Sequence, residues 1–236
     1  MVYEHRHPIL SLSNFRWIIR NRAWSWNYLV RYFRFIRLRV LGPRYVVCTG
    51  FVFLGKNVEF HARKGYGRIV IGPWVHIGDN NQVRAHEGTV TIGSKTVMGQ
   101  GNTINAYLDV SIGSECIISD SIYICDFDHR IDRIDIPIRR QGIIKSPVVI
   151  DDDVWIGTKV SILRGSRVGS GSAIGANSVV KGEIPQQSVA AGVPARVIRS
   201  RHTQTAESIA VAEHQAYVTA LTEGALGATT ESSVQP

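Results

Sequence analysis

An aliphatic residue recurs at every sixth position over most of this chain of 236 residues, and no other feature limits its fold so strongly. Leu54 and Phe60 begin the pattern near the N-terminus. The other recurring residues are Ile71, Ile77 and Val83, then Ile92, Met98 and Ile104, then Ile112, Ile118 and Ile124, and finally an unbroken run of Ile150, Ile156, Ile162, Val168, Ile174 and Val180. Self-similarity at a fixed period is typical of repeat architectures, in which successive turns of chain stack on one another.

Three hexapeptides act as one unit of eighteen residues, because the extra residues fall between triplets, after Val83 and after Ile104. Such a unit predicts a triangular coil of short parallel strands, whose aliphatic side chains point to the axis and stack about 4.8 Å apart. An antiparallel sandwich would need hairpin turns that a six-residue period does not provide. Glycines suit the corners of the coil, where a side chain would be crowded or φ must be positive; they are Gly72, Gly78, Gly93, Gly99, Gly113, Gly157, Gly169 and Gly175.

The two ends of the chain lack this repeat and predict helices. Residues 14–41 interleave aromatic and aliphatic residues with Arg and stop at Gly42-Pro43, which is a helix-end signal. Residues 203–236 are rich in Ala, Thr, Ser and Glu, which predicts a helix over 206–221 and then a flexible tail. We therefore divide the chain into a basic, aromatic N-terminal extension (1–48), a coil (49–200) and a C-terminal helix and tail (201–236).

Positive charge is concentrated in the N-terminal extension. Residues 1–44 contain nine Arg and one Glu, which alone accounts for the formal net charge of +8 of the whole chain. A nucleic-acid-binding protein usually spreads its basic residues over the face that meets phosphate, so this distribution argues against nucleic acid as a partner. Two roles for residues 14–41 stay open: peripheral contact with an anionic membrane surface, or packing on the base of the coil.

Cysteine content and hydropathy indicate the compartment. Cys48, Cys116 and Cys125 have neither paired nor metal-like spacing, which fits a reducing cytoplasm. No stretch reaches the roughly 18 apolar residues that span a bilayer, and the first residues lack the apolar core of a signal peptide. We expect a cytoplasmic protein, with any membrane association confined to the inner face of the plasma membrane.

The repeat has one long interruption, between Ile124 and Ile150, where about twenty residues leave the coil. His129 lies early in this loop (125–149), with Asp128 before it and Asp132 after it. An imidazole accepts a proton near neutral pH and a nearby carboxylate can orient it, so His129 is a candidate general base. Cys125 is a weaker candidate, as a covalent nucleophile. It directly follows the inward-pointing Ile124, a position where a side chain more often fills a corner of the coil.

The pattern of an aliphatic residue, Gly and four further residues resembles that of the hexapeptide-repeat acyltransferases, in particular their xenobiotic, maltose and galactoside O-acetyltransferase branch. The resemblance covers residues 50–200 and is strongest over 124–199, which includes DVWIGT and AGVPARVIR. It implies an all-β fold, a left-handed parallel β-helix, assembled as a homotrimer. It also implies that His129 is the general base and that Trp155 packs beside it. For Asp128 and Asp132 two roles stay open: they orient the imidazole or bind acceptor hydroxyls, or they are salt-bridge partners in a basic loop.

The same resemblance implies where the acyl donor binds. Thr158 and Ala176, one full coil apart in the sequence, would offer backbone groups to the pantetheine arm of acetyl-CoA. Lys181, Arg196 and Arg199 would lie near the nucleotide, whose phosphates call for basic side chains. Lys181 arrives one position earlier than the lysine of relatives, which commonly read Thr-Lys at this point, so its contact is the least secure of the set.

Tyr107 marks a second departure from the family, because it takes the place of an acidic residue that binds the acceptor in the galactoside branch. The expected activity is transfer of an acetyl group from acetyl-CoA to a hydroxyl of a sugar, glycan or envelope polysaccharide, without a metal. Two alternatives stay open. One is a non-catalytic scaffold, and the other is a zinc enzyme like the γ-type carbonic anhydrases, although His61, His76 and His86 do not share the coil register that zinc would need.

Overall fold

The computed structural model describes residues 12–20, 24–201 and 215, and it divides the chain into one unit of residues 1–200 and another of 201–236. The second unit contributes only Arg201 and Gln215 to the described residues, so the helix and tail expected over 203–236 lie outside them. Among the described residues, the first unit contains two α-helices, a short 3-10 helix and every strand.

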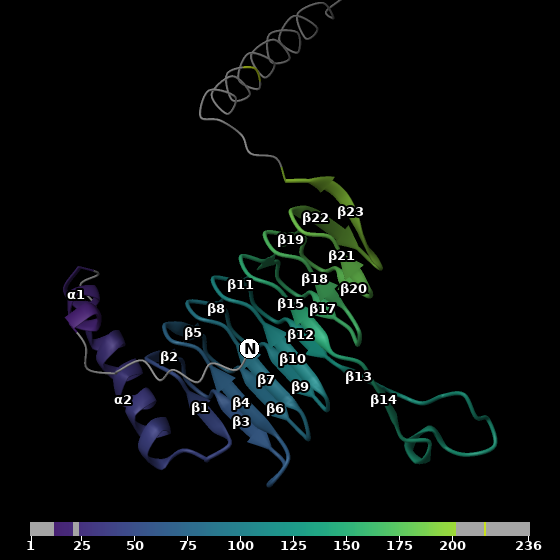
Figure 1. Cartoon of the computed structure of the whole chain (residues 1–236), viewed down its shortest axis with the longest axis horizontal. Coiled ribbons are helices and arrows are strands. Elements are labelled where there is room, and N and C mark those ends of the chain that lie inside the picture. The colour runs from purple at the N-terminus through teal and green to yellow at the C-terminus, as the bar shows by residue number, and fades with distance from the viewer. Residues whose placement is uncertain (1–11, 21–23, 202–214, 216–236) are drawn as a thin grey trace, which may run out of the picture. The chain divides into compact units, whose positions relative to one another are not determined.

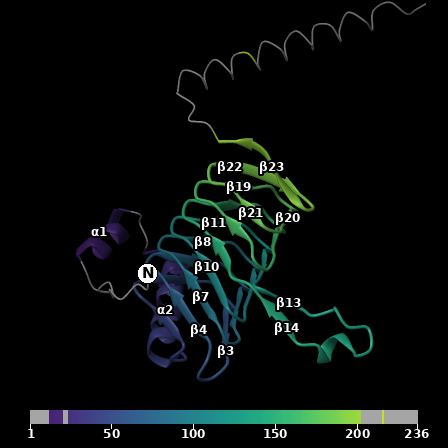
Figure 2. The same ribbon diagram turned by 45° about the vertical axis from the view of Figure 1, so that its right-hand side comes forward.

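Residues 46–200 wind into a three-sided coil, in which each side is a parallel sheet (Figures 1 and 2). Sheet A contains β1 (Val46–Cys48), β4 (Arg68–Ile71), β7 (Thr89–Ile92), β10 (Asp109–Ile112), β15 (Val148–Ile150), β18 (Arg167–Val168) and β21 (Glu183–Ile184). Sheet B contains β2 (Val52–Leu54), β5 (Val75–Ile77), β8 (Val97–Met98), β11 (Ile117–Ile118), β16 (Trp155–Ile156), β19 (Ala173–Ile174), β22 (Ser188–Gly192) and β23 (Ala195–Ser200). Sheet C contains β3 (Glu59–Ala62), β6 (Gln82–Ala85), β9 (Thr103–Ala106), β12 (Tyr123–Cys125), β17 (Ser161–Ile162) and β20 (Val179–Val180).

The six-residue repeat forms the core of the coil, as the sequence predicts. Equivalent residues of successive rungs pair in register, so that Ile92 is opposite Ile112 in sheet A and Ile118 is opposite Ile156 in sheet B. Every recurring residue from Ile71 to Val180 is buried, whereas Phe60 near the N-terminal end is only partly buried. Removal of stacked aliphatic side chains from water is the main force that stabilises such a coil.

Crowding explains the glycines at the corners. A Cβ on Gly78 would lie 2.4 Å from the carbonyl oxygen of Gly99 on the next rung. Positive φ falls instead two positions after each of these glycines, on glycine at Gly101 and Gly171 but otherwise on non-glycine residues, such as Lys95 at 59° and Lys159 at 56°. The rungs therefore approach one another at the corners more closely than any side chain allows.

The coil is longer than its aliphatic repeat at both ends. It begins at β1, inside the segment assigned to the N-terminal extension, because Val46–Cys48 pairs with Ile69–Ile71. After Val180, Ile184 and Ala190 add two further buried positions. β23 then turns back and pairs antiparallel with β22, so that the last strand covers the C-terminal edge of sheet B.

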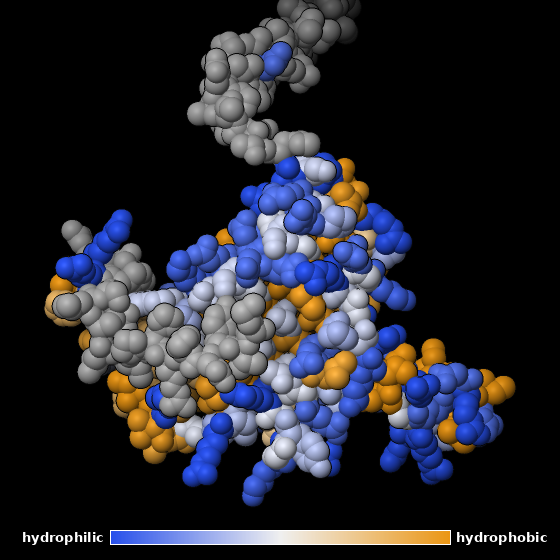
Figure 3. Space-filling view, in the orientation of Figure 1, coloured by the Kyte–Doolittle hydropathy of each residue, from blue (hydrophilic) through white to orange (hydrophobic). Residues whose placement is uncertain are grey.

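Two helices precede the coil: α1 (Leu12–Arg20) and α2 (Trp26–Leu41), which ends at the predicted Gly42-Pro43 signal. α2 packs on β2, with Phe35 buried and the rings of Tyr28 and Tyr32 each 5.9 Å from that of Phe53. Neither described helix is both long and apolar enough to cross a membrane. Figure 3 shows that α2 also carries hydrophobic side chains on a surface that is exposed to solvent.

His76 belongs to the aromatic cluster between α2 and sheet B. Its ring stacks on Phe53 at 4.1 Å between centroids. Burial, and then the charge of Arg31, lowers the pKa of His76 to about 4, so the imidazole is neutral at pH 7. This histidine acts as a packing group that joins α2 to the coil.

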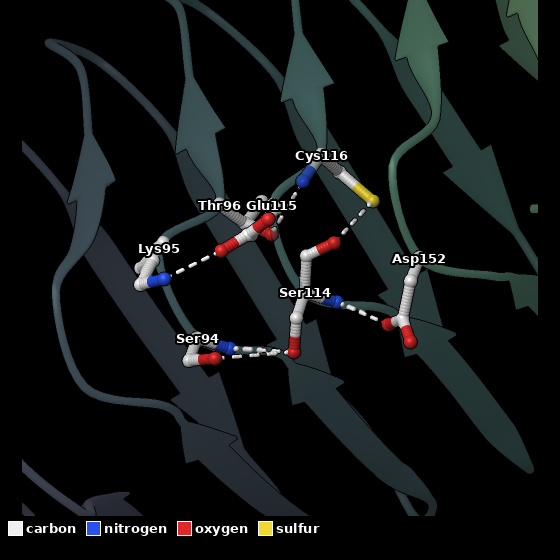
Figure 4. Close-up of polar contacts among 7 residues, drawn as sticks. All are labelled: Ser94, Lys95, Thr96, Ser114, Glu115, Cys116 and Asp152. Carbon is white, nitrogen blue, oxygen red and sulfur yellow. Dashed lines mark hydrogen bonds and ion pairs between the residues drawn. The ribbon is translucent and has the colours of Figure 1, made fainter. Parts of the chain in front are cut away.

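Polar side chains tie successive rungs together at the corner between sheets A and B (Figure 4). The amide of Ser94 donates to Ser114 Oγ at 3.1 Å, and the amide of Ser114 donates to Asp152 Oδ1 at 2.6 Å. Inside the same corner the amide of Cys116 donates to Thr96 Oγ1 at 3.1 Å. These bonds satisfy backbone groups that the short strands leave unpaired.

Candidate active site

The interruption of the repeat forms an arm that leaves the coil at the corner between sheets C and A, after β12. The arm consists of β13 (Phe127–His129) and β14 (Ile143–Lys145), which pair antiparallel, with a 3-10 helix (Ile138–Arg140) in the loop between them. In both ribbon views the two strands project away from the three-sided coil (Figures 1 and 2). The chain then rejoins the coil at β15.

Asp126 fixes the base of the arm. Its side chain is fully buried and accepts hydrogen bonds from the amides of Tyr107 at 2.8 Å and Leu108 at 2.7 Å. Its carbonyl accepts from the amide of Ser146, which is where the arm returns. A buried carboxylate bound by backbone amides is costly to remove, so Asp126 sets the direction in which the arm departs.

His129 lies on the outer part of β13, and its side chain is exposed in the single protomer. Its ring neighbour is Phe127, with 6.4 Å between centroids. Asp128 forms an ion pair with Arg164 of the coil at 2.8 Å, and Asp132 forms a longer one with Arg130 at 3.4 Å. The two predicted carboxylates therefore pair with arginines in this chain, and Asp128 ties the arm to the next rung.

Tyr107 lies below the arm in a small aromatic cluster. His86 stacks on it at 4.6 Å between ring centroids, and Phe127 meets it edge-on at 4.6 Å. Lys145 lies over the Tyr107 ring and bonds to Glu87 at 3.0 Å. The hydrogen bond from Lys145 is the main cause that lowers the pKa of Glu87.

A cavity of about 330 Å³ opens beside this cluster. Its lining is mixed, with imidazole, phenol, carboxylate and guanidinium groups that serve as hydrogen-bond partners for a polar ligand. The lining residues are His61, Ala62, Arg63, His86, Glu87 and Tyr107. The structure thus places predicted Tyr107 in a cavity next to the arm that carries His129.

Thr158 and Ala176 lie at a different corner, between sheets B and C. They are on adjacent rungs, where the amide of Asn177 donates to the Thr158 carbonyl at 2.9 Å. Both residues are exposed, and within the described ranges neither of their own amides donates to a protein group. Lower down the same corner, the carboxylates of Asp79 and Asp120 accept from the corner amides of the preceding rung. The upper rungs therefore present two open N–H groups, one coil apart.

The three predicted basic residues are divided between corners. Arg196 is paired with Ala191, whose Cβ lies 2.9 Å from where a Cβ on Gly175 would be, so Arg196 joins the corner of Thr158 and Ala176. Arg199 is paired with Val189, further along β22. Lys181 follows β20 and lies at the corner between sheets C and A, the corner from which the arm departs.

Trp155 lies on the outward face of sheet B, with about half of its side chain exposed. It continues an outward column of Val97 and Ile117, which pair with it in register and are also exposed. Among the described residues no ring contact or hydrogen bond joins Trp155 to His129. The predicted packing of these two side chains is thus not formed within one protomer.

Neither the cysteine nor the zinc alternative finds geometric support. Cys125 is buried, and burial is the main cause that raises the pKa of its thiol, which disfavours the nucleophilic thiolate. His76 faces α2 from sheet B, His61 is on sheet C, and His86 follows β6 at the next corner. His61 and His86 line the same cavity, but His76 lies away from them, so the three histidines that the zinc alternative needs do not converge.

Asp126, Arg164 and Glu87 are residues of this region that the sequence reasoning missed. Asp126 offered a signal, because a carboxylate directly after the last strand residue before a long excursion is placed to cap the corner. The pairing of Arg164 with Asp128 joins residues 36 apart, and that of Lys145 with Glu87 joins residues 58 apart. No local sequence pattern indicates pairs at such separations.

Comparison with known proteins gives consistent matches. The family model for the bacterial transferase hexapeptide (six repeats) matches residues 147–182. A Mycobacterium tuberculosis protein named "Probable acetyltransferase" is 50% identical over 192 residues, which are 81% of this chain but 64% of that relative. This chain thus spans less than two thirds of that relative's length.

Two solved structures share the coil. A mutant of AntD, an N-acyltransferase from Bacillus cereus in complex with dTDP and coenzyme A, superposes with a TM-score of 0.60 at 22% identity, covering 78% of this chain and 96% of that one. The polySia specific acetyltransferase NeuO superposes with a TM-score of 0.50 at 27% identity, covering 68% and 85%. The repeat and these matches show that the chain shares the left-handed parallel β-helix and is similar to the hexapeptide-repeat transferases, whose family model its residues 147–182 match.

Proposed function

We propose that the protein is a CoA-dependent O-acetyltransferase, which moves an acetyl group from acetyl-CoA to a hydroxyl of a sugar or glycan. The observation that carries this proposal is the pair of open amides at Thr158 and Ala176, which suits the narrow amide chain of pantetheine, in a coil that also carries an exposed imidazole on an arm. The names of the M. tuberculosis relative and of NeuO as acetyltransferases support the same reaction class.

The site is complete only when a second copy of the chain is present. Thr158 and Ala176 lie at one end of sheet C and the arm leaves from the other end, so about five extended residues, roughly 16 Å, separate them. General-base catalysis requires contact at about 3 Å. His129 of one protomer would therefore act beside the open amides of a neighbour.

The outward column of Val97, Ile117 and Trp155 supports this packing. Exposed apolar side chains in register on a sheet form a surface that another subunit would cover. A repeated contact between two different faces of the same chain forms a ring when its rotation closes, and the resemblance to the family's trimers favours a ring of three. We therefore propose a homotrimer in which Trp155 of one protomer packs beside His129 of the next.

Chemistry in this site needs one proton carrier and one oxyanion binder. The imidazole of His129 accepts the proton of the acceptor hydroxyl as the oxygen bonds to the thioester carbon. An amide at the corner of Thr158 and Ala176 stabilises the negative oxygen of the tetrahedral intermediate. The C–S bond then breaks, and the imidazolium returns its proton to the CoA sulfur, which leaves an ester and a free thiol.

The acceptor is placed by the cavity beside Tyr107. Its volume of about 330 Å³ suits one sugar ring, and its imidazole, phenol and carboxylate groups match a ring of hydroxyls. An open cavity also admits one residue of a longer chain, so a glycan or envelope polysaccharide fits as well as a free sugar. We also propose that the reaction takes place in the cytoplasm, which three free, buried cysteines and a CoA thioester donor support.

Turnover of acetyl-CoA tests the proposal directly. Purified protein is mixed with acetyl-CoA and a panel of mono- and oligosaccharides, and free thiol is followed together with the mass of the acceptor. We expect thiol release that depends on an acceptor, with a gain of one acetyl group on the sugar. Thiol release equal to a blank for every acceptor, by protein that remains folded, would favour a non-catalytic scaffold.

A further inference from the structure

We propose that the outer face of α2 and the basic groove beside it form a docking site for the surface of an anionic lipid bilayer. The proposal does not depend on the acyl-transfer reaction, because it concerns the N-terminal end of the coil. It answers which of the two roles left open for residues 14–41 applies, and it names the side chains that carry that role. Three observations carry it: an apolar face, unpaired positive charge, and a groove that combines both.

The apolar face of α2 points away from the coil. From Trp26 to Val40 its exposed apolar residues recur at alternating steps of three and four, and Leu41 follows directly, so they lie on one side of the helix. The opposite side of α2 holds the buried Phe35 and the rings that pack on β2. The exposed residues are Trp26, Leu29, Phe33, Ile36, Val40 and Leu41, and Figure 3 shows hydrophobic surface over this helix.

Positive charge around this face has no acidic partner. The sequence contains no Asp or Glu between Glu4 and Glu59. In the part of the chain that the structure describes, every ion pair involves residues from Glu59 onward, so none of the arginines of α1 and α2 is in one. A cluster of arginines beside aromatic side chains is typical of helices that lie in the interface of anionic membranes.

A groove of about 690 Å³ lies where α2 meets the first rungs of the coil. Arg34, Arg37 and Lys56 supply three cations to its lining, and Arg34 also donates to the Leu54 carbonyl at 3.3 Å. The rest of the lining is largely apolar, with Leu38, Leu41, Pro43, Leu54, Val58 and Phe60. This combination suits a lipid, because the cations can bind its phosphate while the apolar residues contact the first carbons of its acyl chains.

The charge also decides between a bilayer and a second copy of the chain. Two α2 faces packed together would bring Arg37 of each copy against the basic face of the other, where like charges repel. An anionic lipid surface neutralises the same residues. Arg37 lies within the apolar sector, where a long side chain can reach phosphates while its methylenes stay among the acyl chains.

Vesicle sedimentation tests this docking site with the full chain. Binding is compared on vesicles of phosphatidylglycerol and phosphatidylcholine and on vesicles of phosphatidylcholine alone. The double variant Phe33→Ser/Ile36→Ser removes apolar contact, and Arg37→Gln/Lys56→Gln removes charge. We expect binding only to the anionic vesicles, and a fall of about thirtyfold for the charge variant, because each basic side chain near such a surface contributes about fivefold.

Matched variants away from α2 separate docking from general effects. Tyr66→Ser removes an aromatic side chain that is 65% exposed, close to the 67% of Phe33, and Lys64→Gln/Arg68→Gln removes two exposed cations of the coil. Both controls should bind vesicles like wild type, and all variants should melt at the wild-type temperature. Equal binding to neutral vesicles, wild-type binding by the α2 variants, or a subunit stoichiometry that changes with Phe33→Ser/Ile36→Ser would overturn the proposal, the last in favour of contact between copies.

Discussion

Replacement of His129 by alanine is expected to lower kcat for acetyl transfer by about 10² to 10⁴, because the acceptor hydroxyl then loses its only positioned base. KM for acetyl-CoA should stay within about threefold of wild type, since in the proposed site the open amides and not the imidazole hold the donor. Stability should be unchanged, because the side chain is exposed on the arm. Steady-state kinetics measure kcat and KM, and a thermal melt measures stability.

Arg130→Ala provides the matched control for this substitution. Arg130 is the next residue on the arm, is also exposed, and has Asp132 as its one ion-pair partner among the described residues. Its loss should change kcat by less than about threefold, because exposed ion pairs contribute little to structure. A His129→Ala enzyme with kcat close to wild type would remove histidine from the mechanism, whatever the remaining evidence for acetyl-CoA binding.

The second large effect is expected from Ala176→Phe, which fills the space above the two open amides. The pantetheine arm would lose its hydrogen bonds to the corner and would be displaced by the ring, so kcat/KM for acetyl-CoA should fall by about 100-fold. The substitution should affect donor binding and not the fold of the coil, because Ala176 is exposed and the corner backbone needs no rearrangement to carry a larger side chain. Titration of acetyl-CoA by calorimetry and initial rates measure the loss.

The coil itself supplies the control for Ala176→Phe. Gln186 holds the equivalent place at the corner between sheets A and B, where its amide nitrogen lies 2.5 Å from a Cβ built on Gly169, as the amide of Ala176 lies 2.7 Å from a Cβ built on Gly157. Gln186→Phe should therefore keep wild-type kinetics and stability. Equal losses from both variants would mean that a phenylalanine at any upper corner disturbs the coil, and the donor slot would lose its support.

The coil is predictable from the sequence because its core depends on one local rule, an inward aliphatic side chain at every sixth position. That rule identifies every coil strand from Ile71 to Val180 and the interruption between Ile124 and Ile150, but not the two strands of the arm. It also indicates where the corners lie. The resemblance to the family, and not the counting, indicates Thr158 and Ala176, and a spacing of eighteen then places them on adjacent rungs.

Other features are beyond sequence reasoning because they depend on contacts between distant parts of the chain. α2 carries apolar side chains on both of its sides, so its sequence does not indicate which side packs on Phe53. The fit of the side chains to the coil decides this. The antiparallel return of β23 follows from a turn that the repeat does not encode.

Mixing of two inactive variants tests most directly whether the imidazole of one protomer serves the donor slot of the next. His129→Ala retains the slot, and Ala176→Phe retains the imidazole. The two are co-expressed with different affinity tags, mixed trimers are isolated through both tags, and thiol release per protomer is measured. Parallel preparations of each variant alone set the background.

A shared site restores activity in these trimers. In a closed ring of three with both variants present, one of the three interfaces joins an intact imidazole to an intact slot, so activity should recover to about one third of wild type per protomer. Activity that stays at the background of the single variants would contradict the account, because it would place the base and the slot within the same chain.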